Sequence, residues 1–182
     1  LYGSNIENLY YLRDSGYYLY SNFLFVVNSV FPSSQWYGKF ENSTNAFHDN
    51  CNEMKSRDIT QIGLYHGTIS KSMTDVGYVL YDEKTIDDFT GLDCVLLGDV
   101  HTYQYMNEQK TIAYPGSLVQ QNYGESLNNH GMIRWTGLSK NVNKIESKLI
   151  EIANDHGYLS LVIHGDEIIW SHDETSVNQL SD

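Results

Sequence analysis

Short apolar runs separated by turn residues make up most of this sequence. The runs are four to six residues long, rich in aromatic and β-branched residues, and bounded by Gly, Asn, Asp and Ser, a pattern typical of short strands joined by turns. The predicted strands are residues 9–12, 17–20, 23–27, 60–65, 94–97, 111–114, 131–135, 148–152 and 158–163.

Helical signals are few. Residues 85–89 begin with Thr85, a favourable N-cap, and continue with carboxylates in the first turn, so they predict a short helix. A second short helix is predicted at residues 46–57. The order strand, helix, strand favours a layered α/β arrangement in the middle of the chain, and the last third is expected to be antiparallel. The largely polar segment 141–144 links the strand at 131–135 to the last two predicted strands, and it predicts a domain boundary near residue 147.

Composition and charge exclude some classes of function and of cellular location for this chain. The chain has 182 residues, 41% of them hydrophobic, and a net charge of −12, which argues against a surface built for non-specific binding to nucleic acid or an anionic membrane. It leaves room for a local basic strip. Cys94 lies in an apolar run and is expected to be a small buried residue, and neither it nor Cys51 has a nearby partner cysteine. No apolar stretch is long enough to span a membrane, so we expect a cytoplasmic protein, not a secreted one.

Two predicted strands end in side chains that a core does not need. His66 follows the strand at 60–65, and Asp99 and His101 follow the buried strand at 94–97. Ligand sites in open α/β sheets form beyond the carboxyl ends of strands, and imidazole with carboxylate suits manganese, iron or zinc. A metal site is therefore predicted here, although a solvated histidine is the alternative for each. Solvated rings are the expectation for the remaining histidines, His48, His130, His156, His164 and His172.

A third segment, residues 114–125, combines a turn signal with polar residues. Pro115 and Gly116 predict a type II turn, and Ser117 with the backbone amides after it has the composition of a small anion cradle. An ordinary turn between strands is the alternative.

Taken in order, these motifs resemble the calcineurin-like metallophosphoesterases, and most closely the branch of the DNA-repair exonuclease subunit SbcD with its phage and large-virus relatives. The matching segments are His66-Gly67-Thr68, residues 96–101, residues 112–120, residues 123–125, His130-Gly131, and residues 149–158. The resemblance implies the C-terminal part of a layered αββα sandwich at residues 1–147, followed at 148–182 by the start of a small β-rich capping domain.

The resemblance also implies a site with two divalent metal ions, with Mn²⁺ as the preferred metal. His66 would bind one ion, Asp99 and His101 would bind one each, and Asp99 stands where most of the family has histidine. Gly116, Ser117 and Gln120 would line the substrate groove. The family's other ligands and its general acid histidine belong to three earlier motifs that are missing here, so they are expected upstream of Leu1, and this chain is expected to be a largely inactive fragment.

The implied function is a phosphodiesterase that acts on DNA ends, with an SbcC-like ATPase subunit as partner and a homodimer as the assembly of the full-length protein. Two alternatives remain. One is a non-catalytic binding or structural remnant of the same fold, and the other is a phosphoesterase that acts on nucleotides or phosphoproteins.

Overall fold

The computed structural model describes residues 11–31, 35–39, 59–139, 144–154, 157–158, 161–164 and 167–170. These residues contain strands and one short 3₁₀ helix, η1. The elements are β1 (Gly16–Tyr20), β2 (Phe23–Asn28), β3 (Thr60–His66), η1 (Ile86–Phe89), β4 (Cys94–Gly98), β5 (Gln104–Tyr105), β6 (Ile112–Tyr114), β7 (Gly131–Thr136), β8 (Glu146–Glu151), β9 (Leu161–His164) and β10 (Glu167–Trp170).

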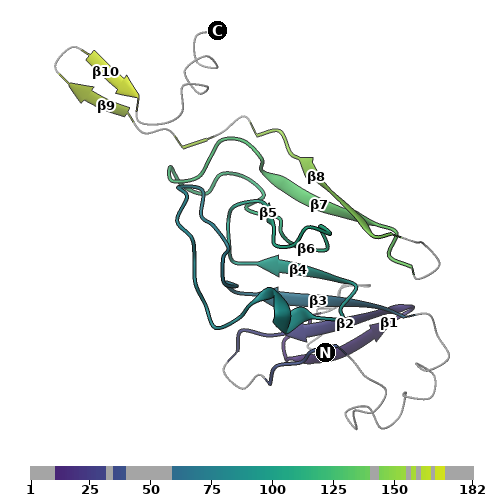
Figure 1. Ribbon diagram of the computed structural model, residues 1–182. Coiled ribbons are helices and arrows are strands. Elements are labelled where there is room, and N and C mark those ends of the chain that lie inside the picture. The colour runs from purple at the N-terminus through teal and green to yellow at the C-terminus, as the bar shows by residue number, and fades with distance from the viewer. Residues whose placement is uncertain are drawn as a thin grey trace.

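Six strands form one mixed sheet in the order β1-β2-β3-β4-β6-β5 (Figure 1). The central pairs β2/β3, β3/β4 and β4/β6 are parallel, whereas the outer pairs β1/β2 and β5/β6 are antiparallel. β7 pairs with β8, and β9 with β10, in two separate antiparallel hairpins. The parallel centre places the carboxyl ends of β3 and β4 at the same edge of the sheet.

Most of the strands predicted from the sequence are present. Most of the apolar residues of β2 and β4 are buried, and Cys94 is 1% exposed, which confirms it as a buried residue. The strand predicted at 9–12 is wrong where the structure describes it, because Tyr11 and Leu12 lie outside any strand. The strand predicted at 158–163 begins at Leu161, and β5 and β10 were not predicted.

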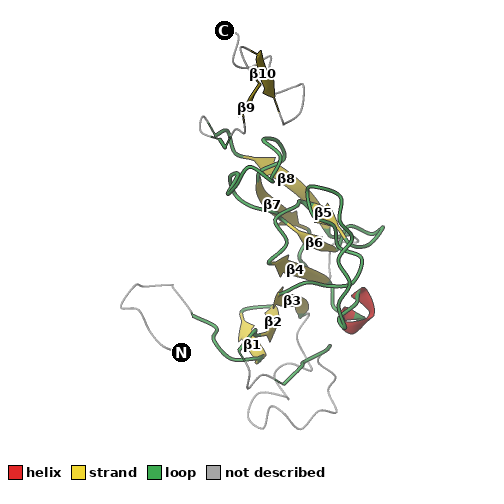
Figure 2. Ribbon diagram, turned by 90° about the vertical axis from the view of Figure 1, so that its left-hand side faces the viewer, coloured by secondary structure: helices red, strands yellow, loops and turns green. Residues whose placement is uncertain are grey.

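The layered αββα sandwich and its α/β fold class are wrong. The described residues contain no α-helix; η1 is a single helical turn beside the sheet (Figure 2). Thr85 begins η1 with a capping box, as predicted, but Gly91 follows it at φ +85°, a left-handed conformation that does not continue a right-handed helix. The connection from β4 to β6 contains β5 instead of a helix. The helix predicted at 46–57 lies outside the described residues.

The predicted boundary near residue 147 remains a prediction. β8 begins at Glu146 and pairs along its whole length with β7, from Gly131 opposite Glu151 to Thr136 opposite Glu146. In Figures 1 and 2 the β9–β10 hairpin lies apart from the six-stranded sheet. Within the described part of the chain, no helix has the length and apolar character needed to cross a membrane.

The buried hydroxyl of Tyr114 ties the sheet to the loop after β3. Its side chain is fully buried, and the hydroxyl donates to the Gly67 carbonyl at 2.7 Å and accepts from the Ile69 amide at 2.9 Å. Burial raises the pKa of Tyr114 above its ordinary value, so the hydroxyl keeps the proton that it donates. β6 therefore fixes the backbone directly after His66.

Replacing Tyr114 with Phe is expected to lower the free energy of unfolding by about 1–3 kcal/mol, because the Gly67 carbonyl and the Ile69 amide lose a buried partner. Urea unfolding followed by circular dichroism measures this. Tyr81→Phe, at a side chain that is 79% exposed, is the control and should change stability by less than about 0.5 kcal/mol. Equal stability of the two variants would show that the Tyr114 hydroxyl does not support the loop.

Candidate functional site

The structure brings His66 and Asp99 together. In the parallel register of β3 and β4, His66 lies opposite Gly98, so Asp99 is the next residue along the neighbouring strand end. His66 Nε2 lies 3.9 Å from Asp99 Oδ1, and both side chains are substantially exposed. A Cβ at position 98 would lie 2.6 Å from His66 Nδ1, so a side chain there would force the His66 ring to move. Gly98 therefore makes room for the His66 ring.

Asp99 adopts an unusual backbone conformation. Its φ of +91° lies in the region that favours glycine, and a non-glycine residue is strained there. Thr68 Oγ1 donates a hydrogen bond to Asp99 Oδ2 at 3.3 Å and helps to direct the carboxylate. Strain of this kind concentrates at binding and catalytic sites, where the surrounding structure maintains it.

His101 is held by a different partner. Its Nδ1 lies 2.8 Å from Oε1 of Glu125, whose side chain is only 5% exposed. Burial acts to raise the pKa of Glu125, but the hydrogen bonds from His101 and the Gln121 amide outweigh it and the pKa is lowered. Because an ionised carboxylate only accepts, Nδ1 of His101 donates, which leaves Nε2 of the neutral ring as a possible metal ligand.

The three predicted ligands do not form a ready-made metal site. Among the described residues, no three His, Cys, Asp or Glu side chains are grouped to hold one ion. His66 and Asp99 fit as a partial set, since two atoms that each lie about 2.1 Å from one ion are separated by about 3.0–4.2 Å. His101 and Glu125 line a neighbouring cleft of about 360 Å³. Asp99 lines both clefts and is the residue that links them.

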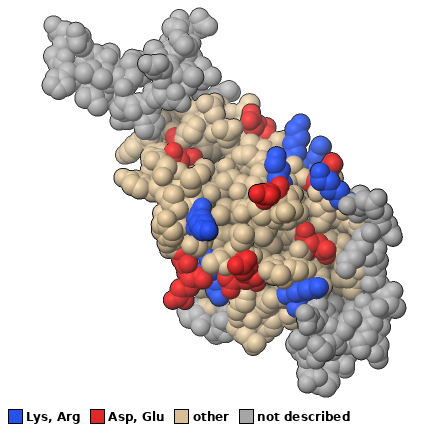
Figure 3. Space-filling view, viewed as in Figure 1, with Lys and Arg blue, Asp and Glu red and all other residues tan. Residues whose placement is uncertain are grey.

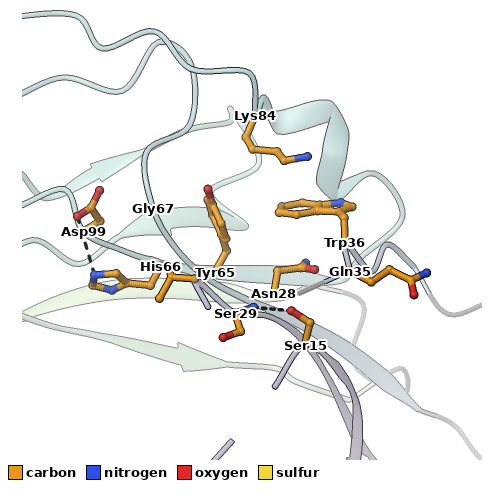
Figure 4. Close-up of a pocket in the computed structure, with 11 residues that line it drawn as sticks. Ser15, Asn28, Ser29, Gln35, Trp36, Tyr65, His66, Gly67, Lys84 and Asp99 are labelled. Carbon is orange, nitrogen blue, oxygen red and sulfur yellow. Dashed lines mark hydrogen bonds and ion pairs between the residues drawn. The ribbon is translucent and has the colours of Figure 1, made fainter. Parts of the chain in front are cut away.

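His66 and Asp99 border an open cleft of about 610 Å³ with an aromatic wall. Figure 4 shows the pair on one side of this cleft and Trp36 under Lys84 on the other, with Tyr65 between them. The Trp36 and Tyr65 rings meet edge to face with centroids 5.3 Å apart, and Lys84 Nζ lies 4.0 Å from the centre of the Trp36 ring.

Sequence reasoning missed Trp36, Lys84 and Glu125 as site residues. Trp36 and Lys84 are far apart in the chain, and only folding brings them to one wall. Glu125 was noted as part of the motif at 123–125, but not as the partner of His101. The spacing of 24 residues between His101 and Glu125 carries no local periodic signal.

The predicted substrate-binding residues lie against the His101 loop. Gly116 has φ +74°, as the predicted type II turn requires, and a Cβ there would meet the His101 carbonyl oxygen at 2.6 Å. The Ser117 amide donates to the same carbonyl, at 2.9 Å. Ser117 and Gln120 are 4% and 5% exposed, and the Gln120 amide group bonds to the backbone of Glu125 and Tyr158. Neither cleft is lined by these residues, and their contact with substrate remains a prediction.

His130 is not a solvated histidine. It is 8% exposed, with Nδ1 3.0 Å from the Ser117 carbonyl and Nε2 2.6 Å from the Ser126 carbonyl. Both ring nitrogens therefore lie within hydrogen-bond distance of a backbone carbonyl oxygen. His130 thereby closes the loop that carries Glu125. Of the other histidines predicted to be solvated, His48, His156 and His172 lie outside the described residues, and His164 lies in β9.

Comparison with known proteins adds one relative. No protein-family model matches the chain. The chain is 41% identical over 163 residues to the uncharacterized protein R555 of Acanthamoeba polyphaga mimivirus, a match that covers 89% of the chain. The same match covers 11% of R555, so the chain spans about a ninth of the length of that relative.

Replacing Glu125 with Gln is expected to destabilise the protein most near neutral pH. Because folding lowers the pKa of Glu125, its stabilising contribution is present above the ordinary value of 4.5 and is lost as the pH falls through the folded pKa. The difference in free energy of unfolding between wild type and variant should therefore shrink between about pH 6 and pH 3. Denaturant titrations across this range measure it.

Glu108→Gln removes an equal charge from an exposed position and is the matched control. The free energy of unfolding of this control should differ little from that of the wild type, and the difference should not shrink between about pH 6 and pH 3. A Glu125→Gln difference that stays constant down to pH 3 would contradict the role given to the ionised carboxylate.

Proposed function

We propose that this chain is part of a divalent-metal-dependent phosphodiesterase that acts on DNA ends, with His66, Asp99 and His101 as metal ligands. The observation that carries the proposal is the His66–Asp99 pair, 3.9 Å apart at the ends of adjacent parallel strands, with Asp99 in a strained conformation. Neither the strain nor the exposed carboxylate contributes to a core.

The proposed cofactors are two divalent metal ions, with Mn²⁺ as the preferred metal. Imidazole and carboxylate together suit Mn²⁺, and an ion of this kind supplies Lewis-acid activation of water and charge neutralisation of a phosphate. His66 and Asp99 would hold one ion. His101 would contribute to the other, and Glu125 would act through His101 by fixing the orientation of its ring.

The cleft beside the pair has the composition of a nucleotide-binding surface. Trp36 and Tyr65 offer aromatic rings, and stacking of a base on an aromatic ring is worth about 1–3 kcal/mol. Asn28 holds this wall in place, since its side chain exchanges two hydrogen bonds with the backbone of Tyr37, at 2.7 and 2.9 Å. The choice of DNA, the SbcC-like ATPase partner and the homodimer rest on the sequence resemblance and belong to the whole protein.

A non-catalytic role is the second candidate. It is favoured by the lack of a three-residue metal cluster among the described residues and by the 68% exposure of the His66 side chain. Little hydrolysis is therefore expected from these 182 residues alone. A phosphoesterase that acts on nucleotides or phosphoproteins would use the same ligands and differ in what the aromatic cleft receives.

Replacing Asp99 with Asn is expected to weaken Mn²⁺ binding to this chain by at least about tenfold, because an amide is neutral and a poorer ligand than a carboxylate. Isothermal titration calorimetry and the electron paramagnetic resonance signal of free Mn²⁺ measure the affinity. His66→Ala and His101→Ala should each weaken it as well.

Asp87→Asn, at an exposed residue of η1, is the matched control and should leave Mn²⁺ affinity unchanged. In a longer protein that contains this chain, Mn²⁺-dependent cleavage of linear DNA should be lost with Asp99→Asn and kept with Asp87→Asn. If the Asp99, His66 and His101 variants all bind Mn²⁺ as the wild type does, the metal-dependent function is wrong.

A further inference from the structure

A second cleft, of about 370 Å³, lies between the turn before β6 and the outer face of the β7–β8 hairpin. Four of the chain's 11 basic residues line it, together with one acidic residue, Glu146. Figure 3 shows Lys and Arg side chains gathered at the upper right over this hairpin. The basic residues are Lys110, Arg134, Lys144 and Lys148. We call this the basic cleft. Its formal charge is +3, in a chain whose net charge is −12.

Two of these cations face each other in the hairpin. Arg134 of β7 lies directly opposite Lys148 of β8 in the antiparallel register, and both side chains are exposed. Like charges in directly opposite positions destabilise a strand pair. The repulsion between the Arg134 and Lys148 side chains therefore lowers the stability of the isolated chain. An anion bound between these two side chains would attract both and offset the repulsion.

Among the described residues, no carboxylate lies within ion-pair distance of Arg134, Lys144 or Lys148. The ion pairs of the described part of the chain involve His66, Lys84 and His101, and none involves Arg134, Lys144 or Lys148. Glu146, the single acidic residue of the cleft, lies opposite Thr136 instead of opposite a cation. The basic residues thus keep their charge available to a partner.

The wall that carries Lys110 is held in place. Asn107 Oδ1 accepts from the amides of Thr111 and Ile112, each at 3.0 Å, and closes the turn that presents Lys110. The Ser147 hydroxyl of β8 donates to the Lys110 carbonyl at 2.8 Å and joins this turn to the hairpin. Lys110 Nζ lies 5.3 Å from the centre of the Tyr105 ring. The spacing between the two walls is therefore built into the fold.

We propose that the basic cleft binds the phosphate backbone of a nucleic acid, independently of any metal ion. Several exposed cations along one hairpin suit a ligand with repeated negative charges, and the acidic remainder of the chain would repel such a ligand elsewhere. The choice of a nucleic acid among polyanions rests on the proposed function. The residues of this cleft do not overlap with those that border His66 and Asp99, so the two sites are separable by mutation.

The test is the binding of a short fluorescent DNA duplex, followed by anisotropy in EDTA between about 50 and 200 mM salt. The double substitution Arg134→Gln with Lys148→Gln should weaken binding by about tenfold or more at the lower salt concentration. The slope of log affinity against log salt should become shallower by about one for each phosphate contact that is lost. The thermal midpoint should stay equal or rise, because the like-charge pair has been removed.

The matched control is Lys39→Gln with Lys71→Gln, which removes the same charge from two exposed lysines outside the cleft and should change affinity by less than about twofold. Because the assay contains EDTA, a failed metal site would leave this result intact. Equal binding by the two double variants would overturn the proposal, as would loss of wild-type binding in EDTA. A polyglutamate peptide that competes as well as DNA would assign the cleft to acidic protein segments instead.

Discussion

The parallel pairing of β3 with β4 is the constraint on which the candidate site depends. Parallel strands end at the same edge, so a register that sets His66 opposite Gly98 also sets Asp99 beside His66. Gly98 leaves the His66 ring in this position, because a Cβ there would lie 2.6 Å from His66 Nδ1. A one-residue shift that placed His66 opposite Leu97 would move Asp99 one residue farther along the neighbouring strand. Tyr114 reinforces this arrangement by fixing the loop that follows His66.

The strands were predictable because their signals are local. Residues 23–27, 60–65 and 94–97 are runs of apolar and β-branched residues bounded by turns, and each forms a strand. The α/β class predicted for the chain was wrong. The helix start at Thr85 and the strand–helix–strand order suggested it, and the family resemblance implied the αββα sandwich, but the residues between the parallel strands carry no long helical period. Thr85 and the carboxylates after it correctly indicated a helix start but carried no information about its length, which Gly91 limits.

The candidate site was likewise predictable in part: its three proposed ligands could be recognised from the sequence, but their supporting partners could not. His66, Asp99 and His101 were recognisable because each follows a strand end, where a polar residue is unusual. Their supporting partners are long-range: Glu125 bonds to His101 across 24 residues, and Trp36 meets Tyr65 through folding alone. The basic cleft was hidden by the net charge of −12, which averages over the chain, whereas Arg134 and Lys148 are brought together only by the register of a hairpin.

Under the two proposals, two kinds of positive charge would serve different purposes: the fixed cations of the basic cleft and the metal ions proposed at the strand ends. Fixed cations on β7 and β8 are available at all times and attract an anion over about a Debye length, roughly 8–10 Å at physiological salt. At the strand ends the fixed charge is negative, because Asp99 is exposed there and would repel a phosphate. Only an added cation reverses that sign locally. Under the two proposals, a chain that is acidic at its candidate reaction site and basic on a separate hairpin would retain a polyanion without metal, and would admit its phosphate to Asp99 only when metal is bound.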